Sequence, residues 1–261
     1  MGHLSRRSAA TAFSAVAAFF VVAFVSSSAR AEFIPFDFVK YIDVDDGVSP
    51  PGGAGEQGVI APFPINGFNI TADAYNFDHD TPGAKVGGSV DASPFAYFDS
   101  QGAGIGVCQF LSDGNSGYCV PSNDDNVTGD ANDNTQGPYG YYTEVLTLSF
   151  GTDDAFISDL WFRNDGHIAS FPAGKHVDVY VDPDGNSANN TLDLFTSYLL
   201  GACTTTPEGR NADANGYCLY DGSNNLVSLE VLAGQVLNIK YSDQQFYLSG
   251  LEMWPVPVPA R

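Results

Sequence analysis

The chain has 261 residues, with Lys+Arg 10 against Asp+Glu 31 and a formal net charge of -21. Proteins that bind nucleic acid need clustered basic residues to displace counterions from phosphate, so this composition excludes DNA and RNA as partners. Hydrophobic residues make up 44% of the chain, enough for a folded core, which excludes general disorder. With 28 Gly and 15 Pro, the composition favours short strands joined by turns over long helices.

The first 31 residues have the features of a secretory signal peptide. Two arginines near the start are followed by an apolar run over 12–25 that is too short to span a bilayer comfortably. Small residues ending at Ala31 match the pattern that a signal peptidase recognises. We therefore expect export, with cleavage after Ala31; an uncleaved anchor is the alternative. The mature domain is expected over 32–254, followed by a Pro-rich tail over 255–261.

Four cysteines lie in the part of the chain that we expect to be exported. They are Cys108, Cys119, Cys203 and Cys218. An exported chain meets an oxidising environment, so the two close pairs predict two local disulfides. These are Cys108 with Cys119 and Cys203 with Cys218, one of three possible connectivities. The spacing within each pair is too wide for the usual ligand pattern of a structural zinc site.

Strand patterns are clearer than any helical pattern. Segments with alternating or short β-branched and aromatic runs cover 36–44, 68–75, 145–150, 156–162, 176–181, 194–200, 226–232, 236–241 and 246–253. In the third of these, Leu146, Leu148 and Phe150 share one face and leave Thr147 and Ser149 outward, which is typical of a half-buried antiparallel strand. No stretch of a dozen residues keeps a 3.6-residue period. The sequence therefore predicts an all-β fold, a two-sheet antiparallel β-sandwich of jelly-roll type.

The motifs of common enzyme classes do not occur in the sequence. It contains no nucleophile elbow, zinc-protease motif, phosphate-binding loop or dinucleotide fingerprint. In the expected mature chain, His79, His167 and His176 each stand apart from any obvious partner. A glycosidase needs only two carboxylates, which spacing in the sequence does not reveal. We expect no enzymatic activity, and a secreted glycan hydrolase stays as an alternative.

The number and type of acidic residues predict calcium binding. They comprise 25 Asp and 6 Glu, and many lie in stretches rich in Asn and Gly. Short carboxylates and amides on turns are the oxygen ligands that calcium prefers. The candidate ligands form three clusters: Asp124, Asp125 and Asn126 with Glu144; Asp182, Asp184 and Asn186 with Asp193; and Asp43, Asp45 and Asp46. The second cluster has part of the spacing of an EF-hand loop, but Ser187 replaces the expected Gly and strands flank it. An EF-hand is therefore excluded, and a plain β-turn is the alternative.

Aromatic residues suggest a possible contact with glycans. Tyr139, Tyr141 and Tyr142 lie in a Gly-flanked segment just before a predicted strand, and flat rings presented in this way can stack on sugars. The alternative is that Tyr141 and Tyr142 begin the strand and pack inside the protein. We expect Trp161 to belong to the core rather than to a sugar-binding surface.

Several short segments resemble exported bacterial proteins that carry a PEP-CTERM sorting signal. These segments are 104–108, 119–126, 144–150, 160–163 with His167, 246–250 and 256–260. The resemblance implies a β-rich protein sent to the cell surface or to an exopolysaccharide matrix, usually without an assigned activity. It also implies a cation bound at Asp125, Asn126 and Glu144. After Ala260 such a signal continues into an apolar helix and a basic cluster, whereas this sequence ends at Arg261. Two interpretations stay open: the sequence is truncated, or the protein is released rather than anchored.

These patterns predict an exported, non-catalytic β-sandwich of the bacterial surface or extracellular matrix, closed by two disulfides and stabilised by Ca²⁺. A carbohydrate-binding module for exopolysaccharide is the alternative. The partners expected are polysaccharide or other matrix proteins, and self-assembly through an exposed edge strand stays open.

Overall fold

The computed structural model describes residues 34–42, 57–59, 62–65, 68–78, 94–99, 102–109, 111–112, 118–119, 126–128, 142–152, 154–182, 196–202, 217–225 and 227–255. All of them lie in one compact unit that spans Ala31–Arg261. The predicted signal peptide and positions 256–261 of the Pro-rich tail lie outside these ranges. Within these ranges, no helix is long and apolar enough to cross a membrane.

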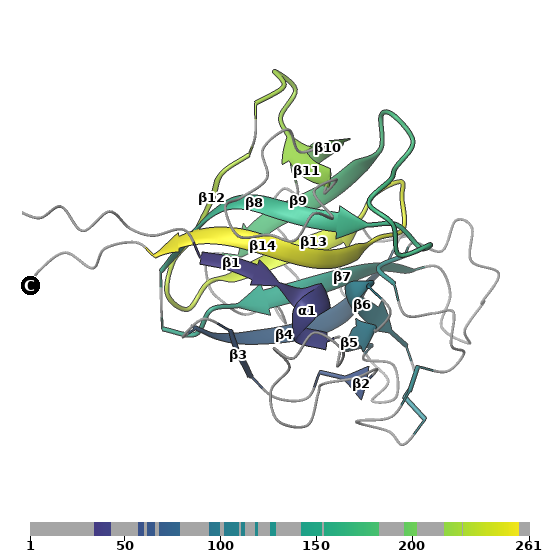
Figure 1. Cartoon of the computed structure of the whole chain (residues 1–261), viewed down its shortest axis with the longest axis vertical. Coiled ribbons are helices and arrows are strands. Elements are labelled where there is room, and N and C mark those ends of the chain that lie inside the picture. Colours follow the sequence, from purple (N-terminus) through teal and green to yellow (C-terminus); the bar gives the residue numbers. More distant parts are fainter. Residues whose placement is uncertain are drawn as a thin grey trace, which may run out of the picture. The chain divides into compact units, whose positions relative to one another are not determined.

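Strands make up most of the described structure, as the composition predicted (Figure 1). The elements are β1 (Ile34–Asp37), α1 (Phe38–Ile42), β2 (Gln57–Gly58), β3 (Phe63–Ile65), β4 (Phe68–Asp78), β5 (Phe95–Asp99), β6 (Gly104–Cys108), β7 (Tyr142–Ser149), β8 (Ala155–Arg163), β9 (His176–Asp182), β10 (Thr196–Ala202), β11 (Tyr217–Tyr220), β12 (Leu229–Val231), β13 (Val236–Tyr241) and β14 (Tyr247–Pro255). The predicted all-β class is confirmed.

The strands pair antiparallel and fold into two sheets. Hydrogen bonds connect them in the order β2-β5-β6-β14-β8-β11-β10-β9-β13-β7-β4-β3, with β1 added to β14 and β12 added to β8. β8 and β11 share a single residue pair, Phe162 with Tyr217. The first sheet is built around β14 and β8, and the second around β9, β13, β7 and β4 (Figure 1). This is the predicted two-sheet antiparallel sandwich.

One hydrophobic core fills the space between the two sheets. Leu146, Leu148 and Phe150 point into it, as the alternation along β7 predicted. Ile239 of β13 and Leu251 of β14 belong to the same cluster and are completely buried. Each large apolar side chain buried in this way stabilises the fold by roughly 1.5–3 kcal/mol relative to exposure, so this core is the main source of stability.

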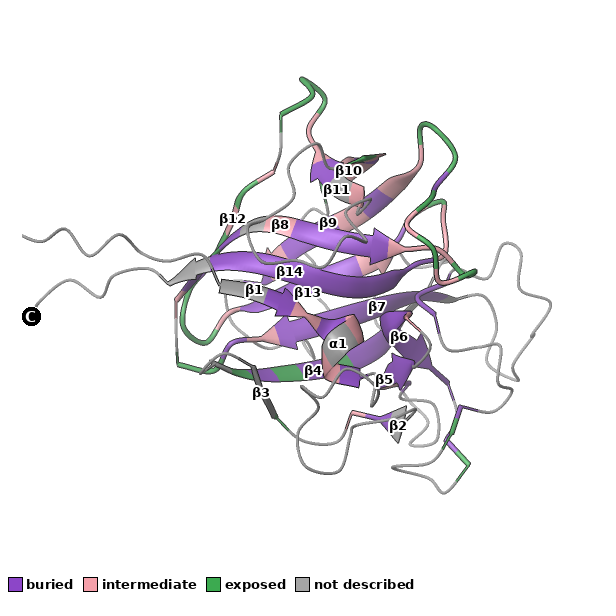
Figure 2. Cartoon of the chain, viewed as in Figure 1, coloured by how far each residue is buried: buried purple, intermediate pink, exposed green. Residues whose placement is uncertain are grey.

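The opposite face of β7 is also buried, which the sequence did not predict. Thr147 is 4% exposed, and its hydroxyl donates a hydrogen bond of 2.7 Å to Oδ1 of Asn238 on β13. Val145 on the same face is completely buried, and Figure 2 shows β7 withdrawn from solvent along most of its length. The predicted half-buried strand is therefore wrong. A hydroxyl that finds a hydrogen-bond partner is buried at little cost, so a Thr does not by itself mark a solvent face.

The predicted strand over 36–44 is wrong over 38–42, because the chain turns there into the helix α1; positions 43 and 44 lie outside the described residues. Phe38 and Ile42, four residues apart, are both completely buried in the core. That spacing places both side chains on one face of a helix. Tyr41 on the same helix packs against Phe98 with ring centroids 5.7 Å apart. Five residues are too short to show a helical period, so only the packing reveals this element.

The other predicted segments contain strands; the bounds of 236–241 are those of β13, and the bounds of the rest are shifted. They correspond to β4, β7, β8, β9, β10, β12, β13 and β14. The segment 226–232 forms a strand only over Leu229–Val231. The strands β2, β3, β5, β6 and β11 were not among the predicted segments.

Candidate functional site

A disulfide joins Cys108 to Cys119, as predicted, with their Cα atoms 5.7 Å apart. Cys108 ends β6 and is completely buried, and Cys119 is 4% exposed. Both pack with Tyr97 and Leu111 in a small cluster of their own. The main-chain N–H of Cys119 donates a hydrogen bond to the hydroxyl of Tyr97 on β5. The disulfide therefore ties the segment after β6 to the β5–β6 hairpin.

The second predicted disulfide and the predicted tyrosine platform stay predictions. Cys203, Tyr139 and Tyr141 lie outside the described residues. Cys218 and Tyr142 lie in β11 and β7, where only their main chain is described.

The predicted calcium ligands are only partly described. Those outside the described ranges are Asp43, Asp45, Asp46, Asp124, Asp125, Asp184, Asn186 and Asp193. Asn126, Glu144 and Asp182 are described, and they are 2%, 0% and 3% exposed. Each of these polar side chains therefore needs a partner inside the protein, because a buried polar group without a hydrogen bond is costly.

Glu144 lies at the centre of a buried cluster of polar side chains. Its Oε1 accepts a short hydrogen bond from Nε2 of Gln109, and its Oε2 accepts one of 2.8 Å from the main-chain N–H of Thr128. Gln109 and Asn76 in turn exchange two amide hydrogen bonds, of 2.8 and 3.2 Å. Hydrogen bonds to a carboxylate favour its charged form and offset the cost of burial. Glu144 thus anchors the segment 126–128 to β7.

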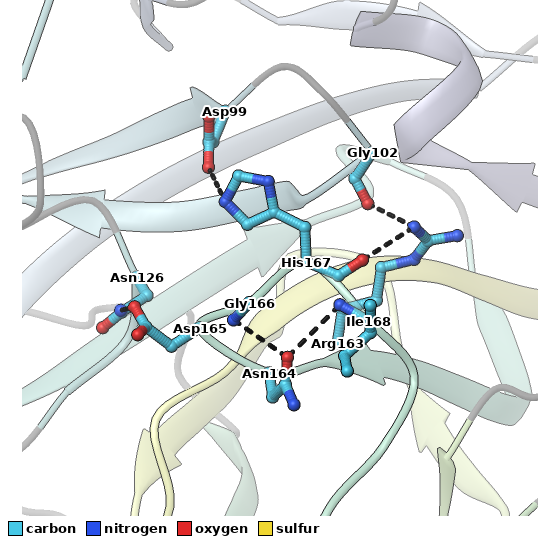
Figure 3. A network of polar contacts seen from close by, with 9 residues as sticks. All are labelled: Asp99, Gly102, Asn126, Arg163, Asn164, Asp165, Gly166, His167 and Ile168. Atoms are coloured by element: carbon cyan, nitrogen blue, oxygen red, sulfur yellow. Dashed lines mark hydrogen bonds and ion pairs between the residues drawn. The ribbon is translucent and has the colours of Figure 1, made fainter.

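Asn126, at the other end of that segment, reaches a different element. Its Nδ2 donates a hydrogen bond of 2.7 Å to Oδ1 of Asp165, in the loop between β8 and β9 (Figure 3). Val127, between the two ends, forms a β-bridge with Phe246. The structure therefore brings Asn126 next to Asp165, which the sequence analysis did not single out. Within the described ranges, no three His, Cys, Asp or Glu side chains gather closely enough to hold a metal ion.

His167 has a carboxylate partner that the sequence did not reveal. Its Nε2 lies 3.0 Å from Oδ2 of Asp99, the last residue of β5 (Figure 3). The Asp99 side chain is 2% exposed, whereas that of His167 is 29% exposed. The imidazole also packs edge-on against Tyr247, with ring centroids 5.3 Å apart. A carboxylate that orients an imidazole occurs in acid–base catalysis and in structural pairs alike.

The loop that carries His167 is held by further polar contacts. Nη1 of Arg163 donates hydrogen bonds to the carbonyl oxygens of Gly102 and His167, and so bridges two loops (Figure 3). Asn164 uses its side-chain amide to bind three main-chain groups of the same loop. His167 has a φ of 57°, a left-handed conformation that is uncommon for a residue with a side chain. These contacts fix the loop against β5 and β14.

A second polar network lies on the face of β4, β7, β13 and β9 that points away from the core. The hydroxyls of Tyr75 and Thr147 both donate to Oδ1 of Asn238, over 2.8 and 2.7 Å. Burial raises the pKa of Tyr75 well above its ordinary value, and the negative charge of Asp182 raises it further. Asn238 is completely buried, so this network belongs to the interior although it lies outside the main core. Of these residues, only Asp182 was predicted from the sequence to belong to a site.

The chain matches no family model, no curated protein and no solved structure.

Proposed function

We propose that this chain is an exported, non-catalytic β-sandwich protein of the bacterial cell surface or extracellular matrix. Polysaccharide or other matrix proteins are the partners that such a location offers. The described polar side chains support a structural role, because Glu144, Asn126 and Asp99 all bind other parts of the same chain.

The observation that carries this proposal is the disulfide between Cys108 and Cys119. Disulfides persist in oxidising compartments outside the cytoplasm and are rare within it. This one closes within the folded interior, among Tyr97 and Leu111, so the folded state itself brings the two sulfur atoms together. The apolar segment over 12–25 supports the same location, because it has the length of a signal peptide rather than of a membrane helix.

The location is tested by expressing two versions in a bacterial host, the full chain and one that lacks residues 1–31. We expect the full chain outside the cytoplasm, with Cys108 and Cys119 linked in unreduced peptide maps. The shortened chain should remain in the cytoplasm and react with thiol reagents. Recovery of the full chain in the cytoplasm with free thiols would contradict the proposal.

We also propose that calcium stabilises this fold through the cluster of Asp124, Asp125, Asn126 and Glu144. The described members carry an amide and a carboxylate, which are oxygen ligands of the kind calcium prefers. The hydrogen bonds that Glu144 accepts from Gln109 and Thr128 favour its charged form, which is the form that binds a cation. A net charge of -21 also repels itself in the compact state, and a bound divalent cation relieves that repulsion.

We expect the melting temperature to rise with calcium and to fall with a chelator. At ten times the dissociation constant, one site contributes about 1.4 kcal/mol to stability. Magnesium should substitute poorly, because it gives up its water reluctantly and demands a tighter octahedron. Differential scanning calorimetry in calcium, magnesium and chelator measures all three effects.

The Glu144→Ala variant should lose most of the calcium response. Because it also loses the hydrogen bonds from Gln109 and Thr128, its melting temperature falls even without calcium. The Gln109→Met variant is the matched control: it removes one of these hydrogen bonds but no proposed ligand, and it should keep the response. Equal shifts of the melting temperature with calcium and magnesium would mean that the cations only screen charge and that the calcium site does not exist.

A further inference from the structure

The aromatic ring of Tyr220 on β11 lies over Gly201 of the neighbouring strand β10. A Cβ atom at position 201 would meet both Cδ2 and Cε2 of Tyr220 at 2.8 Å, so the ring occupies the space that a side chain would take. The hydroxyl of Tyr220 donates a hydrogen bond of 3.0 Å to the carbonyl oxygen of Ala202. Contact along one edge and a hydrogen bond at the tip therefore hold the ring in place. A ring held in this way loses little conformational entropy when a ligand packs on it.

This ring lies on the face of β9, β10 and β11 that points away from the core. Leu200 and Leu219 stand opposite each other on β10 and β11, and both are buried in the core. Side chains alternate between the two faces of a strand, so the adjacent Leu199 and Tyr220 lie on the outward face. Leu199, Gly201 and Tyr220 are each half-buried rather than buried. Part of this apolar surface is therefore in contact with solvent.

Polar side chains with exposed ends lie on the same outward face. Leu199 stands opposite Tyr220 on one side and opposite His176 of β9 on the other. Two strand spacings therefore separate Tyr220 from His176, which is about 10 Å. The side chain of His176 is 40% exposed, and its Nδ1 lies 3.5 Å from Oδ2 of Asp243, whose side chain is 42% exposed. An imidazole donates and accepts hydrogen bonds, and a carboxylate accepts them.

This combination favours a neutral oligosaccharide over other ligand classes. A sugar ring packs its C–H groups on an aromatic ring and presents hydroxyls at its edge, which both donate and accept hydrogen bonds. Anionic ligands are disfavoured by Asp178 and Asp243 and by the net charge of -21. An extended peptide binds by adding a strand to a free edge, whereas β10 is already paired with β9 and β11.

We propose that the outward face of β9, β10 and β11 binds a neutral oligosaccharide, with one sugar ring stacked on Tyr220 and a hydroxyl of a neighbouring sugar bound by His176. The distance between these two residues exceeds the width of one sugar ring, so only a ligand of several sugars reaches both. The inference rests on the proposed surface location for where such a saccharide is met. Binding is measured on the purified protein, so its failure and the failure of the location test are distinguishable.

The probes are cellotetraose, maltotetraose and mannotetraose, with D-glucose and D-mannose as single sugars, each titrated into the folded wild-type protein. Calorimetry gives the affinity, and NMR follows the ring protons of Tyr220 and His176. We expect at least one tetrasaccharide to shift both sets of signals in a saturable way. The single sugars reach only one of the two groups, so they should bind about tenfold more weakly, the effect of one lost hydrogen bond.

Two outcomes of this titration would overturn the proposal. One is that none of the three tetrasaccharides moves the signals of Tyr220. The other is that only a polyproline peptide, titrated in parallel, moves them, because proline rings also stack on aromatic side chains and the surface would then bind a protein.

Three variants separate the aromatic surface from its structural role. Tyr220→Leu keeps an apolar cover over Gly201 but removes the aromatic ring, so oligosaccharide affinity should fall about tenfold. Gly201→Ala keeps the tyrosine but displaces its ring, and it should also weaken binding. Tyr118→Ala removes a tyrosine that is 64% exposed elsewhere, and it should bind like the wild type. Wild-type affinity in Tyr220→Leu would overturn the assignment. If that variant does not fold, the Tyr220 signals of the wild-type protein still decide.

Discussion

In the double variant Cys108→Ala, Cys119→Ala, we expect the free energy of unfolding to be about 3 kcal/mol lower than in the wild-type protein, because the disulfide no longer restricts the unfolded chain. The loop that it closes has a sequence separation of 11. A second loss follows from the position of Gln109, directly after Cys108. Without the disulfide, Gln109 is held less firmly against Glu144, so the effect reaches the polar cluster at the end of β7.

Urea unfolding of both proteins, followed by circular dichroism, measures this difference. The double variant Cys203→Ala, Cys218→Ala serves as the comparison, and a loss of similar size there would support the second predicted disulfide. Unchanged stability of the first variant would show that the loop is held by packing around Tyr97 and Leu111 alone. Peptide maps that joined Cys108 or Cys119 to Cys203 or Cys218 would contradict the pairing seen in the structure.

Strands with regular side-chain patterns could be predicted from the sequence. In β7 and β13 the core positions Leu146, Leu148, Leu237 and Ile239 recur every second residue, which is the period of a strand. The same pattern did not predict that the opposite face of these strands is also buried. Thr147 and Asn238 are polar, and each is buried because the other supplies a hydrogen bond across the strand pair. A single sequence does not show that two such residues face each other.

The strand β6 escaped prediction because its glycines weaken the usual strand signal. Gly104 has a φ of 127°, a conformation that residues with side chains rarely adopt. A Cβ atom at this position would also collide with the main chain of Leu248 and Ser249 on β14. The glycine is therefore required by the close approach of a strand more than a hundred residues away, which the local sequence does not contain.

In the candidate sites too, contacts between residues that are distant in the sequence could not be predicted. Cys108 and Cys119 are close in the sequence, so their pairing could be predicted and is confirmed. The partners of His167 and Asn238 are distant in the sequence, because Asp99 and Tyr75 lie on other strands of the sandwich. Only the register and order of the strands bring these groups together. Isolated histidines and amides in a sequence thus carry little information about their environment in an all-β fold.

Truncation of Trp161 is expected to have the largest effect of any single substitution considered. Trp161 lies on β8 and is 1% exposed, so the prediction that it belongs to the interior is confirmed. It stands opposite Gly250 of β14 in the strand register. Trp161→Ala should lower the free energy of unfolding by about 3–5 kcal/mol, the usual cost of removing a buried aromatic side chain.

Thermal and urea unfolding measure this loss, and Tyr118→Ala is the control. Tyr118 is 64% exposed, so its truncation should change the free energy of unfolding by no more than about 0.5 kcal/mol. Normal stability of Trp161→Ala would contradict the prediction that packing of the buried indole stabilises the fold. The two aromatic positions differ mainly in burial, so the difference between the two variants reports how much stability this part of β8 draws from packing.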